Sequence, residues 1–325
     1  MRRSRWLSLF VLLSLALVPM PVASASARHS VDRIDLPVGW QPEGITTNGK
    51  VIYSGSLATG AILKADPRSG RTRVLPHSAT GKPAVGLEYD RRRRVIWVAG
   101  GPTGEIRAQK ASNGKLLRTY TFPTGERFIN DLVVTRRAVY ATDSLNAVIG
   151  VVRLGGRAHK RLPASRTVRT LALSGDYVQQ PGFNANGIVA SRGRLLVVQT
   201  STGKLFRVSR HTGRAREVDL GEATLLNGDG MEIRRDILYV VRNQFNLVAV
   251  VDLNRRLTRG EVVDELTGDV DVPSTVAVVR HHVWVVNARF GGTPDEQAAK
   301  GYWLTRLGRH HHSHHHHSHH PHHQH

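Results

Sequence analysis

The sequence of 325 residues contains no cysteine. Without thiols the chain can neither form disulfides nor accept a lipid through cysteine, so the folded protein must rest on its packed core alone. The sequence also lacks a long apolar run. Its most hydrophobic stretch, from residue 6 to about residue 18, is about 13 residues long, whereas a membrane-spanning helix needs about 20. No membrane span is therefore predicted for the mature protein.

Acidic side chains are scarce. The chain has 25 aspartates and glutamates against 46 lysines and arginines, and its formal net charge is +21. Arginine exceeds lysine by 38 to 8, which indicates genomic base composition, and no aromatic residues alternate with the basic ones as a nucleic-acid interface would require. The arginine runs at residues 91–94 and 136–137 are predicted to be hairpin tips. Outside the cell, such a basic surface would attract anionic envelope polymers.

A secretory signal peptide is predicted at residues 1–27. A basic segment with three arginines precedes the short apolar run, and two overlapping A-x-A sites end at Ala25 and Ala27. We expect cleavage after one of these alanines, and a location that is secreted, extracellular or in the cell envelope.

The chain ends in a histidine-rich tail, residues 310–325, which holds 12 of the 18 histidines. Tracts of this kind bind borderline divalent metals without a fixed geometry. We expect the tail to be disordered and to chelate Ni²⁺, Cu²⁺ or Zn²⁺. A metal-handling role and an incidental affinity both stay open.

One short phrase, usually a polar residue and a small one before a β-rich run, occurs six times along the chain. The phrases start 42, 45, 56, 43 and 45 residues apart, and a period in the forties made of strands is the mark of a β-propeller with one four-stranded blade per repeat. We predict an all-β, six-bladed β-propeller with four-stranded blades around a central channel, formed as a single, monomeric domain by residues 28–309. The phrases are Glu43-Gly44-Ile45, Val85-Gly86-Leu87, Asn130-Asp131-Leu132, Asn186-Gly187-Ile188, Asp229-Gly230-Met231 and Ser274-Thr275-Val276.

The ends and the loops of the propeller can also be predicted. Residues 34–36 are expected to add an outer strand beside residues 303–307 and so close the ring. The fourth repeat starts 56 residues after the third, which is longer than the other spacings. We expect the extra residues around residues 174–183, either as a lid or specificity wall or as a loop packed on its own blade. A helical period is found only at residues 294–300.

Equivalent positions of a closed ring face one axis, so the first residues of the repeats form the candidate site. Glu43, Asn130, Asn186 and Asp229 supply two carboxylates and two amides. Two bare carboxylates would repel in a site with little water unless a cation or a proton lay between them. Ca²⁺ suits such oxygen ligands, ahead of Zn²⁺ or Mn²⁺, because Zn²⁺ prefers histidine or cysteine. The alternative is that these residues only form turns, since Asn and Asp are common before Gly.

Four short sequence motifs, spread over about residues 42–307, resemble those of the SMP-30/gluconolactonase/LRE-like family of six-bladed propellers, also called regucalcin-type. The resemblance implies that Glu43, Asn186 and Asp229 bind a divalent metal and that Asp229 is the general base. It implies that Asn130 and Arg127 lie on the substrate side. The motifs are Pro42-Glu43-Gly44, Arg127-Phe128-Ile129-Asn130-Asp131, Asn184-Ala185-Asn186-Gly187 and Asn227-Gly228-Asp229-Gly230.

The chain departs from this family pattern around the second motif. Two residues, instead of one, separate Arg127 from Asn130, and Leu132 stands where the family has glycine. The export signal also differs from the cytosolic sugar lactonases of the family, so the resemblance does not supply a substrate.

Two functional hypotheses follow. The first is a secreted, divalent-metal-dependent hydrolase of a lactone or ester, in which the cation polarises the carbonyl group and Asp229 moves the proton. The second is a non-enzymatic binding propeller, NHL-like or YVTN-like, whose axial metal is structural and whose loop face recognises an envelope ligand or protein.

Overall fold

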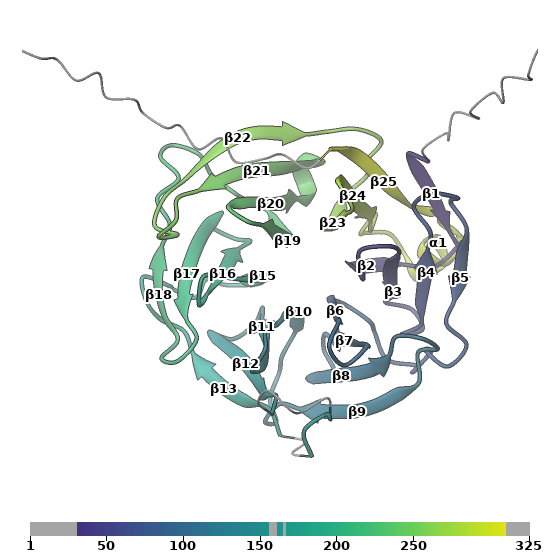
Figure 1. Cartoon of the computed structure of the whole chain (residues 1–325), viewed down its shortest axis with the longest axis horizontal. Coiled ribbons are helices and arrows are strands. Elements are labelled where there is room, and N and C mark those ends of the chain that lie inside the picture. Colours follow the sequence, from purple (N-terminus) through teal and green to yellow (C-terminus); the bar gives the residue numbers. More distant parts are fainter. Residues whose placement is uncertain (1–30, 156–160, 165–166, 310–325) are drawn as a thin grey trace, which may run out of the picture.

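The computed structural model describes residues 31–155, 161–164 and 167–309. The predicted signal peptide at residues 1–27 and the tail at residues 310–325 lie outside the described residues. Six sheets stand around a common axis as the blades of a propeller (Figure 1). The predicted fold class, an all-β six-bladed propeller, is confirmed.

Each blade runs outward from the axis through successive antiparallel hairpins, so its first strand lies nearest the centre (Figure 1). Blade 1 contains β2 (Pro42–Thr47), β3 (Ile52–Ser56), β4 (Ile62–Ala65) and β5 (Thr72–Val74). Blade 2 contains β6 (Leu87–Asp90), β7 (Val95–Ala99), β8 (Glu105–Lys110) and β9 (Leu116–Thr121). Blade 3 contains β10 (Ile129–Val134), β11 (Ala138–Asp143), β12 (Val148–Arg153) and β13 (Arg169–Ala172).

Blades 4 and 5 follow the same order, and blade 4 gains one short extra strand at its outer edge. It contains β15 (Ala185–Ser191), β16 (Arg194–Gln199), β17 (Lys204–Ser209) and β18 (Arg214–Glu217), with β14 (Ser174–Gly175) parallel to β18. Blade 5 contains β19 (Gly228–Arg234), β20 (Ile237–Arg242), β21 (Leu247–Leu253) and β22 (Gly260–Leu266), with the 3-10 turn η1 (Asn243–Phe245) between β20 and β21.

Blade 6 closes the ring with strands from both ends of the described chain. It contains β23 (Pro273–Val279), β24 (His282–Asn287), β25 (Tyr302–Arg309) and, outermost, β1 (Arg33–Leu36). β1 runs antiparallel to β25, with Ile34 opposite Leu304. The prediction that residues 34–36 add an outer strand beside residues 303–307 is confirmed, with residues 34–36 opposite residues 302–304.

The turns between the strands use the residues that tight hairpins require. The turns between the third and fourth strands of blades 1, 2 and 4 contain Gly70, Gly114 and Gly213, whose φ angles of 71°, 80° and 71° are strained for other residues. The arginine runs at residues 91–94 and 136–137 join the first and second strands of blades 2 and 3, as predicted.

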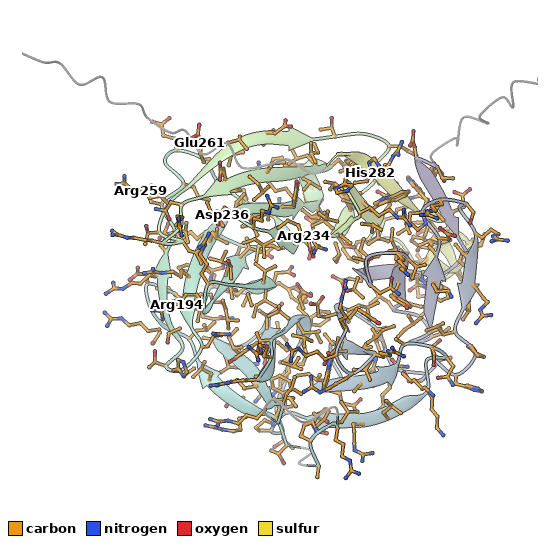
Figure 2. All side chains as sticks on the ribbon, in the orientation of Figure 1. Arg194, Arg234, Asp236, Arg259, Glu261 and His282 are labelled. Carbon is orange, nitrogen blue, oxygen red and sulfur yellow. The ribbon has the colours of Figure 1, made fainter. Side chains whose placement is uncertain are left out.

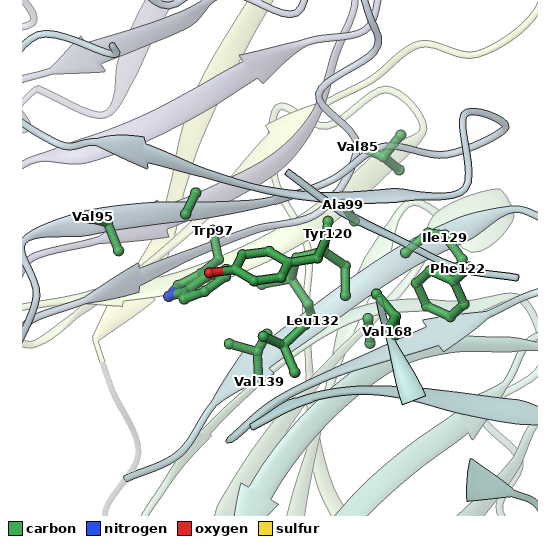
Figure 3. Close-up of a cluster of buried hydrophobic side chains, with 14 of the residues drawn as sticks. Val85, Val95, Trp97, Ala99, Tyr120, Phe122, Ile129, Leu132, Val139 and Val168 are labelled. Carbon is green, nitrogen blue, oxygen red and sulfur yellow. The ribbon is translucent and has the colours of Figure 1, made fainter. Parts of the chain in front are cut away.

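The hydrophobic core lies between neighbouring blades. Between blades 2 and 3, Trp97 of β7 and Tyr120 of β9 have ring centroids 5.6 Å apart, and they pack with Leu132 and Val139 of blade 3 (Figure 3). The Trp97 side chain is fully buried. Its truncation to alanine would cost about 3–5 kcal/mol, so each interface between blades is a main source of stability.

The late start of the fourth repeat has a different cause from the one predicted. The connection between β12 and β13 covers residues 154–168, whereas the matching connections in blades 1, 2, 4 and 5 have six residues or fewer. Most of the surplus therefore lies there, and its placement at residues 174–183 is wrong, because the repeat starts alone do not locate an insertion within a blade. The first part of residues 174–183 packs on its own blade, where β14 pairs with β18 and the buried Tyr177 lies against Phe206, with ring centroids 5.3 Å apart. At its end, Phe183 is exposed and lies against Phe128.

The helical period at residues 294–300 corresponds to α1 (Pro294–Ala299). Thr293 and Glu296 form a reciprocal capping box at its start. No helix in the described ranges is long and apolar enough to cross a membrane.

Candidate functional site

The repeated phrase marks a β-bulge in the inner strand. In blades 1, 3, 4, 5 and 6 the pairing of the first two strands shifts at the phrase, for example between Pro42 and Ile45 and between Gly228 and Met231. A bulge inserts an extra residue and turns a side chain out of the regular alternation of the strand. In these five blades the irregularity turns the first residue of the phrase toward the axis.

Glycine follows several of these ring residues because the next blade packs against it. A Cβ atom on Gly44 would lie 2.2 Å from the carbonyl oxygen of Val85, and one on Gly187 would lie 2.2 Å from that of Asp229. Both distances are far below van der Waals contact. In blades 1, 2, 4 and 5 the glycine of the phrase is therefore a packing requirement that lets neighbouring inner strands approach one another closely.

The four polar ring residues are buried around the axis. Asp229 keeps 3% of its surface exposed, and Glu43, Asn130 and Asn186 keep 6% each. Oε2 of Glu43, Oδ1 of Asn130 and Oδ1 of Asn186 have no hydrogen-bond partner. Buried polar atoms are rarely left without a partner in folded proteins, so three such oxygens at equivalent ring positions indicate a site built for a ligand.

A hydroxyl group sets the orientation of the Asn130 amide. Ser144 donates its proton to the carbonyl oxygen of Ala185 at 2.7 Å, so its Oγ is left to accept from Nδ2 of Asn130 at 3.0 Å. Because Nδ2 is held in this way, the carbonyl oxygen of the amide stays free of protein partners. The hydrogen bond from Ser144 to Ala185 also joins blade 3 to blade 4.

The next two blades repeat this device. Thr200 donates to the carbonyl oxygen of Gly228 at 2.6 Å and accepts from Nδ2 of Asn186 at 3.1 Å. In blade 5, Nδ2 of Asn243 donates to Oδ2 of Asp229 at 3.1 Å. All three supporting residues stand 14 positions after their ring residue, directly after the last residue of the second strand.

The ring positions of blades 2 and 6 differ from the other four. Val85 is apolar, and the hydroxyl of Ser274 donates to the backbone carbonyl of Glu43 at 2.6 Å. The Ser274 oxygen, which the sequence offers to the axis, is thus used to join blade 6 to blade 1.

Burial governs the charge state of the two axial carboxyls. Desolvation raises the pKa of Asp229 to about 7, partly opposed by the hydrogen bond from Asn243. Desolvation also raises the pKa of Glu43 well above its usual range, and the nearby carboxylates of Asp229 and Asp131 raise it further. Neither Glu43 nor Asp229 pairs with a basic side chain within the described ranges. Each negative charge therefore lacks compensation from the protein itself.

This donor set fits a hard divalent cation. Two carboxylates balance a charge of +2, and the free amide oxygens of Asn130 and Asn186 are neutral ligands of the kind that Ca²⁺ accepts. Water could satisfy the amides but could not balance the carboxylates. In the part of the chain that the structure describes, no three His, Cys, Asp or Glu side chains form a group that could hold a metal. The fit is therefore to mixed carboxylate and amide ligands.

The remaining predicted site residue is Arg127. Its guanidinium group already has partners in the protein. Nη1 of Arg127 lies 2.9 Å from Oδ2 of the buried Asp143, and Nε donates to the carbonyl oxygen of Pro123 at 2.9 Å. The side chain keeps 14% of its surface exposed. The role of Arg127 as a substrate contact stays a prediction, whereas its ion pair anchors the loop before β10.

Below the ring, three more acidic side chains face the channel, and sequence reasoning missed all of them. Asp131 lies beside a cavity of about 240 Å³, together with Glu88 and Glu232. Burial raises the pKa of Asp131 and of Glu232 to about 7 and that of Glu88 to about 8. Glu232 has a partner in Arg234 at 2.8 Å and keeps 24% of its side chain exposed, which weakens the effect of burial there.

The supporting residues of the ring were also missed, although the sequence carries a signal for them. Ser144, Thr200 and Asn243 share the offset of 14 from a polar ring residue, whereas the same offset from Glu43, Val85 and Ser274 gives Leu57, Ala99 and Ala288. Only the three consecutive blades 3, 4 and 5 thus hold their ring side chain by a polar neighbour. An alignment of the repeats with one another would have exposed this offset.

Comparison with known proteins identifies the fold. No family model and no curated protein sequence matches this chain. The Malassezia sympodialis allergen Mala s 1 has a TM-score of 0.64 at 15% identity, covering 88% of this chain and 99% of its own. A streptogramin B lyase has a TM-score of 0.56 at 13% identity, covering 85% and 97%. U3-55K has a TM-score of 0.54 at 9% identity, covering 85% and 98%. These likenesses support the β-propeller fold and do not single out the SMP-30/gluconolactonase family.

Proposed function

We propose that this protein is a secreted, divalent-metal-dependent hydrolase of a lactone or ester, of the SMP-30/gluconolactonase type. The observation that carries the proposal is the pair of unpartnered, buried amide oxygens of Asn130 and Asn186 beside the uncompensated carboxylates of Glu43 and Asp229. Glu43, Asn186 and Asp229 would hold the cation, with Ca²⁺ ahead of Zn²⁺ or Mn²⁺. Asn130 presents its free oxygen in the same way and either completes the ligand set or contacts the substrate.

A cation bound there would polarise the substrate carbonyl and stabilise the developing oxyanion. Asp229 is suited to receive the proton of the attacking water, because a base works best when its pKa lies near the working pH, and burial raises the pKa of Asp229 to about 7. Asn243 holds one carboxylate oxygen of Asp229 and fixes its orientation. Ser144 and Thr200 fix the two amides before any ligand arrives.

The test is turnover of a panel of γ- and δ-lactones with Ca²⁺ and with chelator. Asp229→Asn keeps an oxygen ligand but cannot accept a proton, so it should retain some cation binding and lose roughly 10²–10⁴-fold in kcat. Asn130→Ala should raise KM or lower kcat. Asp66→Asn is the matched control, because Asp66 only accepts a turn hydrogen bond from Arg68 that asparagine can also accept. Activity that persists undiminished in chelator would refute the metal-dependent reaction.

A second candidate function is a binding propeller whose axial metal is structural. Exposed apolar side chains on the ring face favour it: Phe183 before β15, Phe245 between β20 and β21, and Phe290 between β24 and β25 keep 48%, 47% and 42% of their surface exposed. Phe183 is braced by Phe128, with ring centroids 4.9 Å apart at an interplanar angle of 89°. A ligand whose affinity survives Asp229→Asn, with no turnover on the panel, would support this function against the enzyme.

A further inference from the structure

The face opposite the ring carries a groove lined by arginine. The inner strands begin at the ring residues and end at the tips that join them to the second strands, about 20 Å away for a strand like β10. A groove of about 750 Å³ lies among the tips of blades 2, 3 and 4 and an outer turn of blade 4. Neither aspartate nor glutamate lines it within the described chain. Its arginines are Arg92, Arg93, Arg136, Arg137, Arg192 and Arg210.

Two of these arginines are held in place on the blade 4 side. Nη2 of Arg192 lies 2.6 Å from Oδ1 of Asp236 in blade 5, and Nε of Arg210 donates to the carbonyl oxygen of Gly193 at 2.8 Å. In Figure 2, Asp236 of blade 5 lies nearer the centre of the propeller than Arg194 of blade 4. Asp236 compensates the charge of Arg192, so Arg210 supplies the positive charge on this side, and both side chains are ordered before a ligand arrives.

Three other arginines bring positive charge that no side chain of the described residues neutralises. Arg92, Arg136 and Arg137 are exposed, and within the described residues none of their side chains takes part in a hydrogen bond or an ion pair. They belong to blades 2 and 3, so they face the fixed arginines across the groove. Uncompensated charges of one sign in a concave surface concentrate the electrostatic potential and attract anions.

The shape of the groove and the residues that line it indicate which class of anion it can bind. A single-stranded nucleic acid stacks successive bases on several exposed aromatic rings, but Tyr140 of the lining is buried and His211 offers a single exposed ring. A membrane surface is broad and does not enter a groove between hairpin tips. Guanidinium groups from three blades suit phosphate, since each phosphate offers several oxygens to planar donors.

We propose that this groove binds a linear, phosphate-bearing polyanion without bases. The proposal concerns the face opposite the axial site and holds whether or not the protein is a hydrolase. A chain of linked phosphates would lie along the groove, with its charges between the free arginines of blades 2 and 3 and the fixed arginines of blade 4.

The experiment compares two triple variants of the full chain in binding to long-chain inorganic polyphosphate. The groove variant is Arg92→Gln, Arg136→Gln, Arg137→Gln. The matched control changes the net charge equally on the outermost strands of blades 1, 2 and 3 and is Arg73→Gln, Arg118→Gln, Arg169→Gln. The groove variant should bind at least roughly tenfold more weakly at physiological salt, with the slope of log K against log salt reduced by about three. The control should bind like wild type.

Several outcomes would overturn the proposal. Wild type that does not bind polyphosphate, or that binds orthophosphate equally well, would exclude a polymer site. Equal weakening of both triple variants would show that only net charge matters. Tighter binding of oligo-dT, polyglutamate or phosphatidylglycerol vesicles, lost in the groove variant, would assign the groove to another class of partner. Equal melting temperatures of the two variants check that both are folded, and comparison with poly(glycerol phosphate) then distinguishes the two sources of phosphate.

Discussion

The uncompensated carboxylate of Asp229 makes a testable prediction about stability. A carboxyl whose pKa is raised on folding stabilises the folded state only while it is protonated. That stability is complete below the unfolded pKa of 3.8 and is lost as the pH rises through the folded value of about 7. At pH 8 the loss amounts to about 4 kcal/mol, because each pKa unit corresponds to about 1.4 kcal/mol.

Asp229→Asn removes this loss while keeping the shape of the side chain. The asparagine oxygen can still accept the hydrogen bond from Asn243, and its amide group can donate to the unpartnered oxygens of the ring. The variant should also relieve Glu43, whose pKa the Asp229 carboxylate helps to raise. In chelator, the variant should therefore be more stable than wild type by about 4 kcal/mol at pH 8 and equally stable at pH 4.

Scanning calorimetry in chelator between pH 4 and pH 8 measures this difference. For a domain of this size, about 4 kcal/mol corresponds to a rise in Tm of roughly 10 °C. With Ca²⁺ the difference should narrow, because a ligand at a hundred times its Kd stabilises wild type by about 2.7 kcal/mol and the variant by less. Asp66→Asn should follow wild type throughout. A variant that melts below wild type in chelator at pH 8, or a difference that does not grow with pH, would refute the reasoning.

Three further predictions concern the support of the ring, its packing and the tail. Thr200→Val removes the acceptor that orients Asn186 and should weaken Ca²⁺ binding by calorimetric titration roughly tenfold, whereas an unchanged Kd would show that the amide needs no support. Gly187→Ala forces a Cβ atom to within 2.2 Å of a carbonyl oxygen of blade 5 and should cost at least about 1–3 kcal/mol in denaturant unfolding, while Gly301→Ala, with open space around it, should cost little. Truncation after Arg309 should abolish most binding of Ni²⁺, Cu²⁺ or Zn²⁺ and leave the Tm in metal-free buffer unchanged; a large fall would mean that the tail is docked.

The fold could be predicted because a closed ring repeats its chemistry. The spacing of the six phrases gave the number of blades, and the apolar segments after them gave the strands. The pairing of β1 with β25 followed from the need to cover the last edge. The position of the insertion could not be read in this way, because the spacing from Asn130 to Asn186 measures a whole repeat and does not say which of its turns is longer.

The candidate site was predicted only in part. The phase of the repeat placed Glu43 and Asp229 at the axis, but it could not show that their charges lack a basic partner. The hydroxyl of Ser144 and the acidic side chain of Glu88 take part in contacts between blades. These contacts join residues 41 and 42 positions apart, so no pattern within a single repeat encodes them.

The pairing of β1 with β25 also sets the order in which the propeller can form. Ile34 and Leu304 are 270 residues apart, and closing so long a loop costs about 5 kcal/mol of chain entropy. Residues near the start of the chain must therefore wait for residues near its end before blade 6 gains its outer strand. Until then the first and last blades each keep an uncovered face, so the ring gains its stability in one late, cooperative step. A chain shortened before Tyr302 would lack the partner of its own first strand, and removing a blade from this end would leave an open arc in place of a smaller propeller.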